Sequence, residues 1–219
     1  MNKSRTKNKN ISDKLIKIVS ILEKEYPNPT TDLISQSPFQ LLVATMLSAQ
    51  CTDKRVNLVT PSLFEKYPTA LELSNAEQED VEKIIYSTGF YRNKSKNIIA
   101  CAKDIVEKHG GEVPDDINNL TLLPGVGRKT ANCVLGNYFQ PAGIVVDTHV
   151  IRICNLVGVV NSKNPEQIEK QLMALLPKEY WVNFTHYLIK LGRDICIARR
   201  PQCMKCKISE YCDYALSHY

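Results

Sequence analysis

The sequence has 219 residues, of which 43% are hydrophobic and 23% are charged, a composition typical of a soluble globular protein with one large or two small domains. This composition excludes a disordered or collagen-like chain. The longest strongly apolar stretch, residues 39–49, is shorter than the roughly 20 residues that cross a bilayer, and the first ten residues are polar and basic, unlike a secretory signal peptide. We therefore expect the protein to stay where it is made, which for a bacterial source is the cytoplasm.

The net charge of +5 is concentrated in two places. Four basic residues and no acidic residue lie in the first ten positions, and six basic residues against one acidic residue lie between Lys190 and Lys207. Basic charge gathered in this way is typical of a protein that binds a polyanion, most often nucleic acid. The alternative is a solvated tail and a solvated face without a partner.

Helical patterns dominate the chain. Apolar residues recur at three- and four-residue spacing over residues 12–25, with Ser12 as the candidate cap, and Ser37-Pro38 predicts the start of a buried helix over residues 39–48. Further helices are predicted, in chain order, over residues 53–66, 75–87, 91–109, 117–122, 127–138, 148–157, 165–176 and 180–192.

Strand patterns are almost missing from the sequence. Only residues 143–146 resemble a strand, and no two alternating segments are joined by a hairpin turn. The predicted class is therefore all-α. Since no linker rich in Gly, Ser or Pro divides the chain, any second domain is expected to pack closely against the first.

The clearest chemical signal is a group of four cysteines near the C-terminus, spaced C-x6-C-x2-C-x5-C: Cys196, Cys203, Cys206 and Cys212. Four thiolates on short loops can surround one soft metal centre. Zinc ribbons usually carry two close C-x2-C pairs, and only one is present, so the spacing favours a [4Fe–4S] cluster over zinc. A disulfide knot fits an intracellular protein less well. The other four cysteines are predicted to be buried core thiols: Cys51, Cys101, Cys133 and Cys154.

Four basic residues lie in or beside these cysteine loops: Arg199, Arg200, Lys205 and Lys207. A metal centre that fixes the loops would also fix a basic surface for phosphates, and so would form part of a DNA-binding module.

A second signal is the segment L-L-P-G-V-G-R-K-T-A, residues 122–131, which joins two predicted helices through a tight turn. Gly125 and Gly127 allow backbone angles that are closed to other residues and let the main chain approach a ligand. Amides at the start of the second helix would suit a phosphate. The alternative is an ordinary helix–helix turn.

Two residues near this turn carry candidate chemistry. Lys129 lies near the start of a predicted helix, where desolvation and the positive end of the helix would favour the neutral, nucleophilic amine. Such a lysine can attack a sugar carbon. Asp147 follows the apolar residues 144–146 and could accept a proton or stabilise positive charge on the sugar, although an aspartate before a threonine is often only a helix cap.

Four motifs in this order resemble the endonuclease III family of helix-hairpin-helix DNA glycosylases: L-S-A-Q-x-T-D (47–53), L-P-G-V-G-R-K-T-A (123–131), V-D-T-H (146–149) and the cysteine pattern. The resemblance extends from about residue 12 to residue 215. It implies a bifunctional enzyme of base excision repair that removes oxidised pyrimidines from double-stranded DNA and cleaves the strand at the abasic site by β-elimination. It also implies a [4Fe–4S] cluster on the four cysteines and a monomeric enzyme.

The resemblance assigns roles to individual residues. Lys129 is expected to attack C1′ and form a Schiff base, with Asp147 as its activator or as the stabiliser of sugar charge. Gln50 would fill the gap left by the extruded base, and Phe90, where the family pattern leads us to expect leucine, would wedge the base step. The remaining candidate DNA-binding residues are Gly125, Val126, Gly127, Arg128, His149, Arg199 and Arg200, whereas Gln202 replaces an expected basic residue.

The same resemblance implies two α-helical domains with the active site in the cleft between them. Residues 30–140 are expected to form a six-helix domain with the helix-hairpin-helix motif, and residues 1–29 with 141–219 a discontinuous cluster domain. Three competing interpretations are an adenine-removing glycosylase, against which Lys129 argues, a non-catalytic DNA-binding module with a structural metal site, and a redox protein, which leaves the glycine turn and Lys129 unexplained.

Overall fold

The computed structural model describes the backbone of residues 2–27 and 29–218, and the side chains of residues 8–27 and 29–218. Throughout these residues the regular structure is helical, so the predicted all-α class is confirmed. Residues 143–146, the only segment with a strand-like sequence, form an irregular connection into the next helix.

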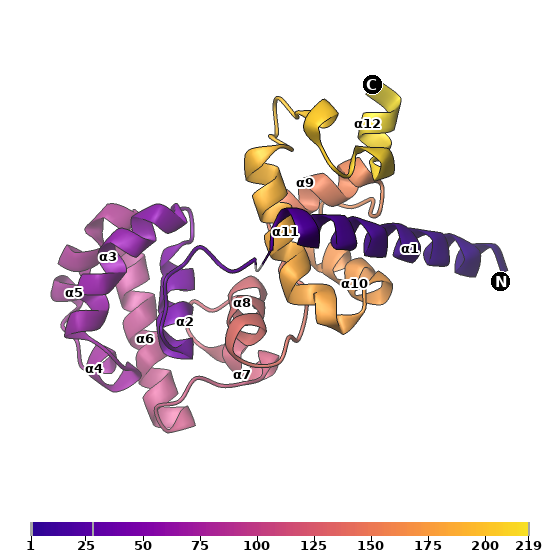
Figure 1. Ribbon diagram of the computed structural model, residues 1–219. Helices are drawn as coiled ribbons and strands as arrows, with labels where there is room; N and C mark the ends of the chain where they lie inside the picture. The colour runs from indigo at the N-terminus through magenta and orange to yellow at the C-terminus, as the bar shows by residue number, and fades with distance from the viewer. Residues whose placement is uncertain (1, 28, 219) are drawn as a thin grey trace. The chain divides into compact units, whose positions relative to one another are not determined.

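The chain divides into two compact units (Figure 1). Residues 31–142 form one unit, which we call the continuous unit, and residues 1–30 with 143–219 form the other, which we call the discontinuous unit. The continuous unit thus begins at residue 31 rather than 30 and ends at 142 rather than 140. Each unit has its own cluster of buried apolar side chains.

The continuous unit contains helices α2 to α8: α2 (Pro38–Leu47), α3 (Asp53–Lys66), α4 (Ala70–Ser74), α5 (Gln78–Ile85), α6 (Tyr91–His109), α7 (Ile117–Leu122) and α8 (Arg128–Tyr138). At the start of α2, the Ser37 side chain accepts a hydrogen bond from the Gln40 amide, and Pro38 occupies the first turn. Helix α2 packs against α3, α6 and α8. Because it has neighbours on several sides, it is apolar almost all round.

One helix of the continuous unit was not predicted from the sequence, and another has different bounds. Helix α4 is short, but its start is marked by a capping box in which Thr69 and Glu72 satisfy each other's backbone amides. The signal T-x-x-E is visible in the sequence. The helix predicted over 75–87 is instead α5 followed by a 3₁₀ helix, η1 (Tyr86–Thr88).

The discontinuous unit contains the other helices: α1 (Asn2–Glu25), α9 (Thr148–Val157), α10 (Pro165–Leu175), α11 (Trp181–Asp194) and α12 (Asp213–His218). Helix α1 contributes four buried residues to the core and packs against α10 and α11. The four residues are Leu15, Ile18, Val19 and Leu22.

Helix α1 begins ten residues earlier than predicted, at Asn2 rather than Ser12. Ser12 is therefore not a cap. Its hydroxyl donates to the Leu175 carbonyl at 2.7 Å, a contact that joins α1 to the end of α10. Of the basic residues in this segment, the side chains of Lys3, Arg5 and Lys7 lie outside the described residues.

The four isolated cysteines follow the core prediction in part. Cys101 and Cys154 are buried, and burial raises the pKa of the Cys101 thiol to about 12. Cys51 and Cys133 are intermediate in exposure and pack against the core, so they are core residues as predicted but are not fully buried.

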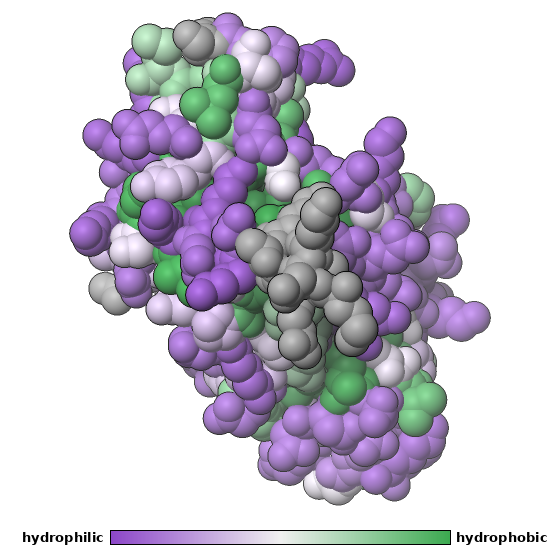
Figure 2. Space-filling view, turned by 90° about the vertical axis from the view of Figure 1, so that its right-hand side faces the viewer, coloured by the Kyte–Doolittle hydropathy of each residue, from purple (hydrophilic) through white to green (hydrophobic). Residues whose placement is uncertain are grey.

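Hydrophilic side chains predominate on the face shown in Figure 2, and hydrophobic ones form small separate patches. Scattered exposed apolar residues of this kind are normal for a folded protein. Within the part of the chain that the structure describes, no helix combines the length and apolar character needed to cross a membrane.

Candidate functional site

The glycine turn joins α7 to α8 and depends on Gly125 in two ways. Gly125 has a φ of +75°, in the region that favours glycine. A Cβ at this position would lie 2.9 Å from Cβ of Asn97 and 3.0 Å from Cε of Met46, so the backbone packs against α6 and α2 where a side chain has no room. Val126 is buried and anchors the turn in the core.

The start of α8 is open. Gly127 is the N-cap, no side chain caps the helix, and a Cβ built on Gly127 would meet nothing within 4 Å. The first-turn amides of a helix have no intrahelical partner and carry the positive end of the dipole, which makes such an open end suited to an anion.

Lys129 lies in the first turn of α8, and its side chain is exposed. The helix start expected beside this amine is therefore present, and the side chain is open to solvent within its own unit. Cys133 lies one turn further along α8 and is partly buried, and this burial raises the pKa of its thiol.

Gln50 and Phe90 share an uncommon backbone conformation. They are the two non-glycine residues with positive φ in the described chain, at 54° and 49°. A left-handed conformation is strained for both residue types and persists where the surrounding structure fixes it, often at functional sites. Phe90 directly precedes α6 and is 63% exposed.

The tertiary structure of the continuous unit brings Gln50, Phe90 and Gly125 together around one cavity of about 220 Å³. Five of its lining residues were not identified as site residues from the sequence: Met46, Ala49, Asn93, Lys94 and Asn97. They lie on α2, just after it, and on α6, and nothing in their local sequence shows that these segments converge at the glycine turn.

In the discontinuous unit, Asp147 is the N-cap of α9. Its half-buried carboxylate accepts a hydrogen bond from the Val150 amide at 2.8 Å, as expected for a cap. The segment leading to it is fixed by Thr185 on α11, whose hydroxyl donates to the Val145 carbonyl at 2.9 Å. His186, also on α11, has its pKa lowered by burial and by Lys190, while Asp147 acts in the opposite direction.

His149 packs inside the discontinuous unit. Its Nδ1 atom is buried without a hydrogen-bond partner, and a Cβ on Gly192 would lie 2.2 Å from that atom. Gly192 is therefore the residue on α11 that makes room for the imidazole. The packing fixes the ring orientation next to the cap of α9.

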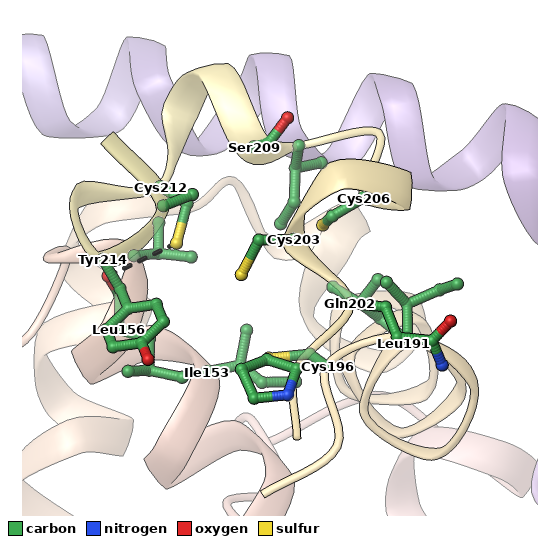
Figure 3. Close-up of a pocket in the computed structure, with 15 residues that line it drawn as sticks. Ile153, Leu156, Leu191, Cys196, Gln202, Cys203, Cys206, Ser209, Cys212 and Tyr214 are labelled. Atoms are coloured by element: carbon green, nitrogen blue, oxygen red, sulfur yellow. Dashed lines mark hydrogen bonds between the residues drawn. The ribbon is translucent and has the colours of Figure 1, made fainter. Parts of the chain in front are cut away.

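The four C-terminal cysteines line one cavity, and Figure 3 shows their thiol groups arranged around a common space. Mostly apolar side chains complete the lining, together with Gln202 and Ser209. Burial raises the pKa of three of the thiols: Cys196, Cys203 and Cys206. Binding of a metal centre as thiolates would therefore release protons.

Side-chain hydrogen bonds to backbone carbonyls hold this loop on α9. Arg152 donates to the Cys196 carbonyl at 2.5 Å. The Cys212 thiol donates to the Leu156 carbonyl at 3.5 Å, the contact that is dashed in Figure 3. Two 3₁₀ turns, η3 (Cys203–Lys205) and η4 (Ser209–Tyr211), lie between the cysteines. The basic residues of the loop are exposed: Arg199, Arg200, Lys205 and Lys207.

The four thiols of this cavity are the candidate ligands of the expected metal centre. In the described part of the chain, no group of three or more His, Cys, Asp or Glu side chains is close enough to hold a single metal ion. Thiolates are the ligands that both zinc and iron–sulfur clusters take, so the donor set of this cavity fits the expected cluster.

Known proteins resemble this chain in sequence and in fold. Residues 43–178 match the profile described as "HhH-GPD superfamily base excision DNA repair protein". Endonuclease III of Synechocystis sp. (strain ATCC 27184 / PCC 6803 / Kazusa) is 49% identical over 199 residues, which cover 90% of this chain and 91% of that protein.

Two solved structures of endonuclease III with DNA share the fold. One is a non-covalent complex and the other a trapped covalent intermediate with an estranged adenine. For each, the TM-score is 0.88 and the identity 40%, with 94% of this chain and 97% of the other covered. The helix-hairpin-helix fold implied by the resemblance is therefore confirmed, and the chain belongs to the endonuclease III family of the HhH-GPD superfamily of base excision DNA repair proteins.

Proposed function

We propose that this protein removes oxidised pyrimidines from duplex DNA and cleaves the strand at the resulting abasic site. The observation that carries this proposal is the exposed Lys129 in the first turn of α8, directly after the glycine turn, in a chain with 49% identity to an endonuclease III. An amine in this place can act as a nucleophile where phosphate groups bind the turn.

The chemistry follows from the amine. The lone pair of Lys129 Nζ attacks C1′, the N-glycosidic bond breaks, and the base leaves with the bonding electrons and takes up a proton. Opening of the sugar ring gives a Schiff base between C1′ and Nζ. Loss of a proton from C2′ then expels the 3′ phosphate, and water releases the sugar fragment from the lysine.

Lys129 must lose its own proton before it attacks. Its side chain is exposed in the continuous unit, at the open start of α8, so DNA can reach the amine there. Asp147, a carboxylate at a helix start, is proposed to accept a proton or to stabilise the positive charge that develops on the sugar.

Extrusion of the damaged base requires residues that replace it in the stack. Gln50 is proposed to fill the gap, and Phe90 to wedge the neighbouring base step by stacking. Their exposure and their shared left-handed backbone support these roles. Phe90 offers a flat ring where leucine was expected, so it can stack as well as insert.

Phosphate binding is proposed for two surfaces. The amides of Gly125, Val126 and Gly127 with Arg128 form the first, and the exposed Arg199 and Arg200 form the second. His149, two residues after Asp147 and fixed by its packing against Gly192, is proposed as a neighbour of the reacting nucleotide.

We also propose that the four cysteines hold a [4Fe–4S] cluster: Cys196, Cys203, Cys206 and Cys212. The cluster would link four points of the loop to one another and so hold Arg199 and Arg200 in place, which is a structural contribution. The proposed enzyme acts as a monomer in the compartment that contains the DNA.

The test is a trapping experiment with duplex DNA that carries one oxidised thymine. Wild-type protein is expected to form a covalent adduct when borohydride reduces the Schiff base, and to cleave the strand when borohydride is omitted. Lys129→Ala is expected to do neither, whereas Lys103→Ala, which removes an exposed lysine on α6, should behave like wild type. A wild-type protein that binds the duplex without adduct or cleavage would identify a non-catalytic DNA-binding module instead.

A further inference from the structure

Lys94 on α6 is a buried cation with two defined partners. Its side chain is 7% exposed, and its Nζ donates to the Leu47 carbonyl and to the Thr88 carbonyl, each at 2.8 Å. A buried ammonium is costly unless its N–H groups are hydrogen-bonded. Burial lowers the pKa of Lys94, as expected for a cation in this environment.

The two carbonyls mark the ends of two short segments. Leu47 is the last residue of α2, three positions before Gln50, and Thr88 is the last residue of η1, two positions before Phe90. One ammonium therefore joins the segments that carry the two strained residues. The Lys94 amide also donates to the Phe90 carbonyl at 3.0 Å, so the backbone and the side chain of Lys94 both hold the second segment.

We infer that Lys94 is a positioning residue that sets the distance between Gln50 and Phe90, and thereby controls extrusion of the damaged base. This inference rests on the proposed function. Lys94 also lines the cavity that Gln50, Phe90 and Gly125 share, so a shift of either segment changes the shape of that cavity. The last carbonyls of a helix have no intrahelical donor. At the end of α2, the Lys94 ammonium donates a hydrogen bond to one of these carbonyls.

The central test replaces Lys94 by methionine, which has a similar length and no N–H group. Lys94→Met is expected to lower the single-turnover rate of excision from a duplex with one oxidised thymine by tenfold or more. Schiff-base trapping on the same duplex with the base already removed should fall by a factor at least three times smaller than the factor for excision. No paired base has to be extruded from that duplex. The matched control is Lys96→Met, on the same helix but exposed, which should leave both rates unchanged.

A double-mutant cycle separates positioning from a general structural effect. If Lys94 acts through Phe90, Phe90→Ala should slow excision strongly in the wild-type background and by less than twofold in the Lys94→Met background. Equal losses on both substrates, or effects of the two substitutions that simply multiply, would overturn the inference.

Folding is measured beside activity by thermal unfolding. Should Lys94→Met fail to fold, Lys94→Gln provides a second variant, since its amide can donate to one carbonyl. Lys94→Gln is expected to retain the trapping reaction and to lose excision. Excision by Lys94→Gln at the wild-type rate would overturn the inference. Failure of the proposed function itself gives a different result, because wild-type protein would then form no trapped adduct on the abasic duplex.

Discussion

At the scale of single residues, the two glycines of the turn have different physical requirements. Gly125 needs both a positive φ and the absence of a Cβ, whereas Gly127 has a φ of −91° and open space around it. Gly125→Ala is therefore expected to lower the free energy of unfolding by about 1–3 kcal/mol through backbone strain and crowding. Denaturant unfolding of the two alanine variants measures this, and Gly127→Ala should lie within about 1 kcal/mol of wild type.

Gly127→Ala tests a separate property of the turn. The added methyl group would stand where the backbone amides are proposed to approach a phosphate, so we expect weaker binding to duplex DNA with unchanged stability. Fluorescence anisotropy with a labelled duplex at fixed salt measures the affinity. Equal affinities of Gly127→Ala and wild type would show that the turn does not contact DNA through its main chain.

His186 gives the discontinuous unit a pH dependence. Its pKa in the folded protein is lowered, chiefly by burial, so the unfolded chain binds a proton at a higher pH than the folded chain does. Stability is therefore full above the unfolded pKa of about 6.5 and falls as the pH drops from there towards the folded pKa. Thermal unfolding between pH 7.5 and 5.5 should show a slope that is reduced in His186→Gln. A slope of equal size in this variant would assign the effect to other groups.

At the scale of elements, Asp147 combines a structural and a proposed chemical task. Asn is as good an N-cap as Asp, so Asp147→Asn should retain the stability of α9 and lose the activity that depends on charge. Asp147→Ala should lose the cap as well, at about 1 kcal/mol. Single-turnover excision and denaturant unfolding of both variants separate the two tasks, and full activity of Asp147→Asn would exclude a catalytic charge.

Helix α9 also has a specific end. It stops at Gly158, which has a φ of +80°, and Lys14 on α1 donates to the Val157 carbonyl at 2.6 Å and to the Asp213 carboxylate at 2.7 Å. A cation at a helix C-terminus complements the dipole. Lys14→Met is expected to lower the free energy of unfolding by about 1–2 kcal/mol. Exposed Lys17 on the same helix supplies the control, and an equal loss in Lys17→Met would point to helix α1 rather than to this contact.

At the scale of the whole molecule, two separate cores predict two separable stabilities. Since the cysteine loop has only short 3₁₀ turns, removal of the proposed cluster should expose its backbone and leave the continuous unit intact. Hydrogen exchange of the Cys203→Ala variant should be faster in residues 195–212 and unchanged in residues 31–142. Faster exchange throughout both units would show that the cluster stabilises the protein as a whole.

Local signals in the sequence were sufficient to predict the class, most helices and the motifs. Helical periodicity, caps and the glycine turn depend on residues close together in the chain, and the bounds of α3, α6, α7 and α9 agree with those predicted from them. The early start of α1 was missed because its first residues are polar and lack a periodic pattern. The short α4 was missed because it has too few residues to show such a pattern. The cysteine spacing alone indicated that the four thiols share a site.

The packing of segments that are distant in the sequence decides which side chains are buried and which lie close together. Lys94 and Lys129 are both lysines in the first turn of a helix, yet one is buried on carbonyls and the other is exposed. Burial depends on neighbours remote in the sequence, such as Leu47 for Lys94, and no local pattern encodes them. For the same physical reason, the cavity shared by Gln50, Phe90 and Gly125 exists only because α2, α6 and the glycine turn pack together in the folded protein.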